Sequence, residues 1–142
     1  MCLDGITTRK YLVSSFWNGC GGIMSALKTS MDLACGTGVL CEILYRSGIQ
    51  ASGMDLSHGM IEIARAGNPG ISYDVADMIS YRPERQYDLV TCTGDALNHI
   101  GNLQDIERIF RNVYSYVSPG GYFIFDILNE HEVSNSEPCG CR

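Results

Sequence analysis

Residues 31–40, MDLACGTGVL, combine one acid with small residues in a spacing that suits ligand binding. Small residues such as Gly36 and Gly38 let a ligand approach the backbone, and the free N–H groups of a following helix would face it. Asp55 stands nineteen residues after Gly36, where a carboxylate at a strand end can accept hydrogen bonds from both hydroxyls of a ribose. Together the turn and the acid predict a nucleoside-binding crevice.

The residues around the turn also indicate which nucleoside is bound. Dinucleotide sites usually have three glycines in the pattern G-x-G-x-x-G, because a pyrophosphate must lie on the helix N-terminus. Here Cys41 stands where the third glycine would be, and Asp32 precedes the turn. A carboxylate at that place suits a cationic or amine-bearing ligand better than a pyrophosphate. A nicotinamide-dependent oxidoreductase is therefore kept only as a third hypothesis.

The elements that must position these residues alternate along the chain. Hydrophobic patterns predict strands and helices in turn, with Ser57 as a helix N-cap and SPGG at 118–121 as a break. The run YFIFDIL is typical of a parallel strand buried on both faces. We expect an α/β, Rossmann-like doubly wound and mostly parallel sheet of order 3-2-1-4-5, whose ligands lie beyond the carboxyl ends of the strands. The expected strands are 30–34, 51–55, 71–75, 87–93 and 122–128, and the expected helices cover 38–46, the residues after Ser57, and 103–117.

Composition limits the classes of function. The chain has 142 residues and a net charge of −6, so it predicts one domain without the basic surface that nucleic acid requires. Residues 11–17 are too short for a membrane span, and we expect a cytoplasmic protein. The seven cysteines do not suggest a disulfide framework. Three of them lie in apolar segments and are expected in the core: Cys35, Cys41 and Cys92. The terminal pair, Cys139 and Cys141, is only a weak metal signal, so no metal is expected.

Five segments in order carry a family resemblance: MDLACGTGVL, GMDLSHGMIEIAR, VADM, YDLVTCTGDALNHI and VSPGGYFIFDI. They resemble the class I S-adenosylmethionine-dependent methyltransferases, and most closely the small-molecule type with DLACGTG as first motif. The resemblance covers residues 29–128. It implies methyl transfer from S-adenosylmethionine to an acceptor by direct displacement, with a small-molecule acceptor and no nucleic-acid or membrane partner.

The resemblance also implies roles for individual residues. Asp32 and the turn 34–38 would bound the methionine part of the cofactor, Asp55 would hold the ribose, and Asp77 would accept from the exocyclic amine of adenine. Asp95, Asn98 and His99 would face the acceptor. The cofactor-binding set as a whole is Asp32, Ala34, Cys35, Gly36, Thr37, Gly38, Asp55, Leu56, Met60, Asp77, Met78, Cys92 and Thr93.

No catalytic residue is assigned, because many enzymes of this class need no dedicated acid or base. His99 is a candidate general base, since an unperturbed imidazole titrates near neutrality. The favoured interpretation is a histidine that packs at the start of the next helix. Asp74 competes with Asp77 for the adenine role, but it points the other way along its strand and is left out.

The chain departs from the family at both ends. Residues 1–28 are short for the usual N-terminal part and are interpreted as a partial lid; residues 29–128 form the cofactor-binding core. Residues 129–142 are polar and too short for the two strands that usually follow, so they predict a disordered or truncated tail. The fifth strand would then be an exposed edge open to self-association. A catalytically incompetent cofactor-binding fragment without its acceptor half is the alternative function.

Overall fold

The computed structural model describes residue 22 and residues 25–127. The polar tail and both terminal cysteines lie outside this range, and so does nearly all of the N-terminal segment interpreted as a lid. Their sequence-based assignments stay predictions. No helix in the described part of the chain is long and apolar enough to cross a membrane.

The centre of the fold is one five-stranded sheet in which every neighbouring pair is parallel. Its order is β3-β2-β1-β4-β5, which confirms the predicted topology. The strand order reverses between β1 and β4, so the crevice expected of such a sheet lies beyond their carboxyl ends. The strands are β1 (Thr29–Leu33), β2 (Gln50–Asp55), β3 (Ser72–Val75), β4 (Tyr87–Cys92) and β5 (Val117–Phe125).

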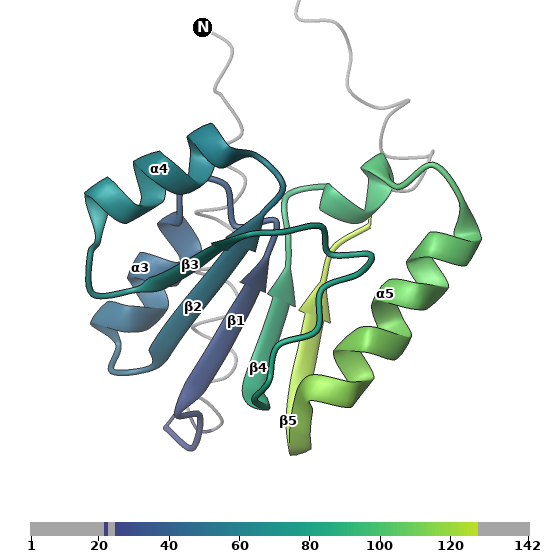
Figure 1. Ribbon diagram of the computed structural model, residues 1–142. Helices are drawn as coiled ribbons and strands as arrows, with labels where there is room; N and C mark the ends of the chain where they lie inside the picture. The colour runs from purple at the N-terminus through teal and green to yellow at the C-terminus, as the bar shows by residue number, and fades with distance from the viewer. Residues whose placement is uncertain (1–21, 23–24, 128–142) are drawn as a thin grey trace, which may run out of the picture.

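Helices cover both faces of the sheet, as Figure 1 shows. Helices α3 (Val39–Arg46) and α4 (His58–Gly67) pack on one face, and α5 (Leu103–Tyr116) packs on the other. Ser57 caps α4 as predicted, because its hydroxyl accepts a hydrogen bond from the Met60 N–H at 3.3 Å. A short 3₁₀ helix, η1 (Ala96–His99), follows β4 and was not predicted.

Two apolar cores result from the alternation of side chains along the strands. One contains Leu44 of α3 and Ile61 of α4, and the other contains Ile109 and Val113 of α5. The three cysteines expected in the core, Cys35, Cys41 and Cys92, are all buried with free thiols. The sheet is therefore fixed from both sides, and its carboxyl edge is a rigid base for the loops that end there.

Two expectations about β5 are wrong. Residues 118–121 do not break the chain between helix and strand, because β5 begins at Val117 directly after α5 and includes them. A register irregularity between Tyr87 and Leu89 of β4 accommodates the extra residues, and Gly120 takes a φ of +77°. The strand is also not buried on both faces: none of its residues is fully buried, because β5 is the edge of the described sheet.

Candidate functional site

The loop between β1 and α3 turns sharply through three left-handed residues. Ala34, Gly36 and Gly38 have φ values of +54°, +56° and +80°. Cys35, directly after Ala34, continues the pairing of β1 with β2, because its N–H donates to the Met54 carbonyl at 2.9 Å. The turn thus has small residues in left-handed conformations at the start of a helix; Ala34 and Gly36 are half-buried, Thr37 is exposed and Gly38 is buried.

Tyr73 of β3 supports this turn from below. A Cβ built on Gly38 would collide with the Tyr73 hydroxyl and would lie 2.9 Å from its Cζ atom. Tyr73 is 4% exposed, and burial raises the pKa of its hydroxyl well above the usual value, so the group is neutral at any physiological pH. The turn is therefore packed against a neutral ring, and only glycine fits at position 38.

Asp55, at the end of β2, joins the two loops beside it. One carboxylate oxygen accepts from the Gly36 N–H at 2.9 Å, and the other accepts from the Ser57 N–H at 2.8 Å. The side chain is half-buried. These two bonds fix the carboxylate at the edge of the sheet, next to the glycine turn, which is the arrangement that the ribose prediction requires.

Asp32 lies deeper than a rim residue would. It is 2% exposed, and its Oδ1 accepts from the Thr91 hydroxyl on the adjacent strand at 2.7 Å. The Cys41 thiol approaches its Oδ2 at 4.0 Å. The Cys35 thiol, burial and the Asp32 carboxylate together raise the pKa of the Cys41 thiol, so this cysteine stays protonated.

The side chains of two predicted cofactor residues lie in the cores. Cys35 belongs to the core under α3 and Cys92 to the core under α5, and both are fully buried. Gly53 explains the first placement, because a Cβ on it would lie 2.9 Å from the sulfur atoms of both Cys35 and Cys41. These positions can therefore contribute backbone atoms to the edge of the sheet, while their sulfur atoms serve packing.

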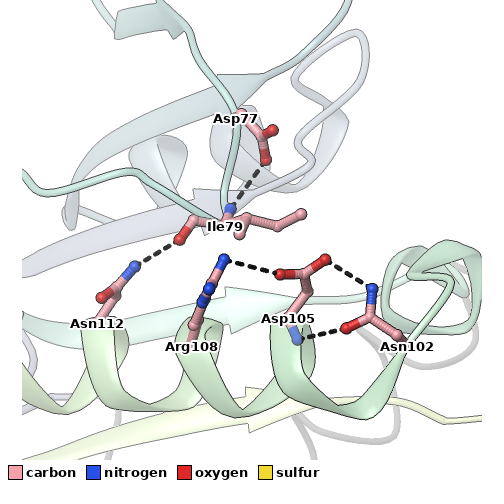
Figure 2. A network of polar contacts seen from close by, with 6 residues as sticks. All are labelled: Asp77, Ile79, Asn102, Asp105, Arg108 and Asn112. Atoms are coloured by element: carbon pink, nitrogen blue, oxygen red, sulfur yellow. Dashed lines mark hydrogen bonds and ion pairs between the residues drawn. The ribbon is translucent and has the colours of Figure 1, made fainter.

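The loop after β3 is fastened to α5, as Figure 2 shows. The buried Asn112 side chain donates to the Ile79 carbonyl at 2.8 Å, and Asp77 accepts from the Ile79 N–H at 2.9 Å. Met78, between them, packs against the core of α5. Asp77 is exposed at the carboxyl edge, while Asp74 bonds to the Tyr81 hydroxyl at 2.9 Å. The two acids thus have different partners, and the role of Asp77 toward adenine stays a prediction.

The remaining predicted residues surround the same edge. Leu56 and Met60 lie before and in the first turn of α4 and are exposed, as is Thr37 in the glycine turn. Thr93 follows β4, Asp95 precedes η1, and two further candidates, Asn98 and His99, are exposed on η1. His99 thus lies on this short helix and does not pack at the start of α5.

Sequence reasoning missed Asp126 and Asn112. Asp126 follows β5, and its carboxylate accepts from the Gly94 and Asp95 N–H groups at 2.7 and 3.1 Å. Asp55 was identified because it stands at the end of an expected strand, whereas Asp126 lay inside the expected strand 122–128 and only the observed end of β5 at Phe125 places it just beyond the strand. Asn112 gave no signal, since an amide in a helix is ordinarily exposed. Among the described residues, no three His, Cys, Asp or Glu side chains are grouped to hold a metal.

Comparison with known proteins identifies relatives of this arrangement. A family model described as a methyltransferase domain matches residues 31–121. The ubiquinone biosynthesis O-methyltransferase of Coxiella burnetii is 28% identical over 109 residues, which are 73% of this chain and 45% of that protein. The chain thus spans about half the length of this curated relative.

Solved structures agree on the fold. An S-adenosylmethionine-dependent methyltransferase from Clostridium acetobutylicum superposes with a TM-score of 0.75 at 27% identity, over 94% of this chain and 55% of that one. CalS10, an amino pentose methyltransferase from Micromonospora echinaspora solved with the cofactor bound, gives a TM-score of 0.72 at 20% identity, over 89% and 58%. At 20% identity the second comparison shows the fold alone.

Proposed function

The chain belongs to the methyltransferase-domain family, and from that premise we propose that it is an S-adenosylmethionine-dependent methyltransferase acting on a small-molecule acceptor. The observation that supports this most is the bond between the Asp55 carboxylate and the Gly36 N–H at 2.9 Å. It places the acid proposed for the ribose directly beside the strained turn proposed for the rest of the nucleoside.

The residues present fit this cofactor. Ala34, Gly36 and Thr37 are half-buried or exposed, so a ligand can approach the backbone of the turn there, whereas Tyr73 fills the space beside Gly38. In the proposal, residues 34–38 hold the methionine part, Asp55 the ribose, and Asp77 and Met78 the adenine, with Leu56 and Met60 alongside. When bound, the cofactor would supply a methyl group on a cationic sulfonium that an acceptor nucleophile displaces in line.

The protein contributes position and charge to that reaction. Asp32 is buried beneath the turn, with Thr91 holding its carboxylate, so negative charge is fixed below the place proposed for a cationic ligand. Thr93 and Cys92 would lie toward the reacting end, and Asp95, Asn98 and His99 would face the acceptor. No acid or base is assigned, since displacement of a sulfonium by a neutral amine or an ionised hydroxyl does not require one.

The relatives suggest which acceptors to try. One is named an O-methyltransferase of ubiquinone biosynthesis, and one structural neighbour is named an amino pentose methyltransferase. Both names describe small organic acceptors, one with a hydroxyl group and one with an amine among its functional groups. A panel of phenols and amino sugars, assayed with radiolabelled S-adenosylmethionine, therefore covers the chemistry that the comparisons favour.

The experiment that tests the proposed function is calorimetric titration of the full chain with S-adenosylhomocysteine. Wild type should bind saturably, and Asp55→Ala should weaken binding by about tenfold or more, because it removes charged hydrogen bonds. Asp88→Ala is the matched control, since this acid also accepts from two backbone N–H groups but lies at the start of β4, away from the carboxyl edge of the sheet. Failure of folded wild-type protein to bind, or tighter binding of NADH, would contradict the proposal.

A catalytically incompetent cofactor-binding module is the alternative that the sequence left open. Both candidates predict binding of S-adenosylhomocysteine. They differ in turnover, because only the enzyme transfers the methyl group to a member of the acceptor panel. Binding without transfer to any acceptor, also after the longer C-terminal part of a relative has been fused, would favour the module.

A further inference from the structure

The turn after β4 has two consecutive left-handed residues. Gly94 has a φ of +76° and Asp95 a φ of +63°. Glycine adopts this region freely, whereas an aspartate there is strained and needs support from its surroundings. Asp95 is also the residue proposed to face the acceptor, so whatever supports this turn determines where that carboxylate lies.

The support comes from Asp126, which lies thirty-one residues further along the chain. Its Oδ2 accepts from the Gly94 N–H at 2.7 Å, and its Oδ1 accepts from the Asp95 N–H at 3.1 Å. Successive N–H groups in such a turn form a concavity that binds anions. Here the anion is a side chain of the protein itself, and each of its oxygens has one donor.

Asp126 connects the end of the sheet to the helix that carries the acceptor-facing residues. Its own N–H donates to the Cys92 carbonyl at 3.3 Å, which extends the pairing of β4 with β5 by one residue. On the other side of the turn, the Asp95 carbonyl accepts from the Asn98 N–H at 3.0 Å and begins η1. The carboxylate is thus fixed to β5, the turn is fixed to the carboxylate, and η1 starts from the turn.

We propose that Asp126 is a positioning residue for the acceptor side of the site: it holds the Gly94–Asp95 turn in its left-handed form and so sets the place of Asp95 and η1. This inference rests on the proposed function for its consequence in methyl transfer. Its structural part, the two N–H bonds, can be tested without any ligand. In the described part of the chain, the loops after β1, β2 and β3 do not bond to Asp126. Its bond to the Cys92 carbonyl comes from the backbone N–H, which a side-chain variant keeps, so cofactor affinity should depend little on the Asp126 carboxylate.

The test uses the full chain labelled with ¹⁵N, in wild type, Asp126→Ala and Asp126→Asn. In Asp126→Ala the Gly94 and Asp95 amide protons should shift upfield and exchange with solvent about tenfold faster or more, because both lose a charge-assisted bond. Asp126→Asn keeps one acceptor oxygen and should give an intermediate result. Asp88→Ala is the matched control, since Asp88 accepts from two backbone N–H groups at the opposite end of β4.

Asp126→Asn keeps the inference testable if Asp126→Ala folds poorly, because it retains one acceptor oxygen, and a double variant adds a check where Asp126→Ala folds. Asp95→Gly removes the strain of the left-handed residue, so the faster exchange of the Gly94 amide caused by Asp126→Ala should be smaller in the Asp95→Gly background. Gly94 and Asp95 signals that do not move in either Asp126 variant, or that move equally in Asp88→Ala, would overturn the inference.

Function provides a further readout. Asp126→Ala should leave the dissociation constant of S-adenosylhomocysteine within about threefold of wild type. With an acceptor found in the panel, it should lower kcat about tenfold, with the KM for S-adenosylmethionine little changed. A loss of cofactor binding as large as that of Asp55→Ala would overturn the acceptor-side role. Failure of wild type to bind S-adenosylhomocysteine would contradict the proposed function. The Gly94 and Asp95 amide signals would still show whether Asp126 holds the turn.

Discussion

The hydroxyl of Tyr73 occupies the space that a Cβ of Gly38 would need, and the Tyr73 Cζ lies 2.9 Å from that position. Gly38 also has a left-handed φ of +80°. Two separate effects therefore exclude other residues here, one in the backbone and one in packing. Because this turn forms the centre of the proposed cofactor site, its glycine couples the stability of the fold to the shape of the site.

We predict that Gly38→Ala lowers the free energy of unfolding by about 2–5 kcal/mol, since the left-handed conformation costs an L residue roughly 1–2 kcal/mol and overpacking adds about 1–3 kcal/mol. Urea denaturation measures the loss. Gly48→Ala is the control, because Gly48 has a φ of +86° with nothing within 4 Å of its Cβ position. It should lose only the backbone part, and equal losses in both variants would contradict a role for Tyr73.

The buried pair of Asp32 and Thr91 supports a second prediction. The Thr91 hydroxyl donates to Asp32 at 2.7 Å, and both side chains are buried. Thr91→Val keeps the shape of the side chain but leaves the carboxylate without this donor. We expect a loss of about 1.5–3 kcal/mol in the free energy of unfolding, the usual range for a hydrogen bond to a buried charged group.

Ser30 provides the control for that prediction. It lies two residues before Asp32 on β1, and its buried hydroxyl has no hydrogen-bond partner within the described structure. Ser30→Ala removes an unsatisfied polar group, so it should be neutral or slightly stabilising in the same urea measurement. If Ser30→Ala is as damaging as Thr91→Val, then packing and not the hydrogen bond accounts for the loss.

The topology could be predicted from the sequence because its signals were local and repeated. Alternating apolar runs and turns gave each strand of the parallel sheet to within a residue or two up to β4, and Ser57 marked the start of α4 by its capping chemistry. The failure at β5 has a physical reason. The apolar run alone indicated burial on both faces, whereas the polar residues 129–142 that follow it predicted the edge position that β5 has in the described sheet.

The site could be predicted only in part. Gly36, Gly38 and Asp55 were identifiable because strained turns favour glycine and because an acid stood at a strand end. The contacts that support the site could not be identified in the same way. Tyr73 packs against Gly38 from thirty-five residues further along the chain, and Asp126 accepts from the Gly94 N–H from thirty-two residues further along. Long-range contacts of this kind depend on the register of the strands in the folded sheet, and no pattern within a short segment of sequence predicts them.

Asp88 supports a prediction about pH. Its carboxylate accepts from the Lys28 N–H at 2.8 Å and from the Thr29 N–H at 3.1 Å. These hydrogen bonds, and the one from Lys28 most, lower the pKa of Asp88 in the folded chain. A lowered folded pKa contributes stability above the unfolded pKa, near 3.9, and that contribution is lost as the pH falls through the folded value.

Asp88→Asn should therefore be less stable than wild type at pH 7, by on the order of 1 kcal/mol for such a partly exposed group. The difference should shrink as the pH is lowered below about 4, because protonated Asp88 and asparagine are then alike. Urea midpoints at a series of pH values measure it. Glu62→Gln on the exposed surface of α4 is the control, and a difference that stays constant down to pH 2 would contradict the assignment.

The edge strand β5 supports the last prediction. Tyr122 and Phe125 remain 42% and 40% exposed there, and an exposed apolar edge can pair with another chain. We therefore predict self-association that increases with protein concentration, measured as molar mass by light scattering. Tyr122→Lys places a charge on the edge and should reduce it, whereas Tyr114→Lys, on the exposed face of α5 at 88% exposure, should not. A monomeric mass at every concentration, or equal effects of the two lysines, would show that this edge does not mediate association.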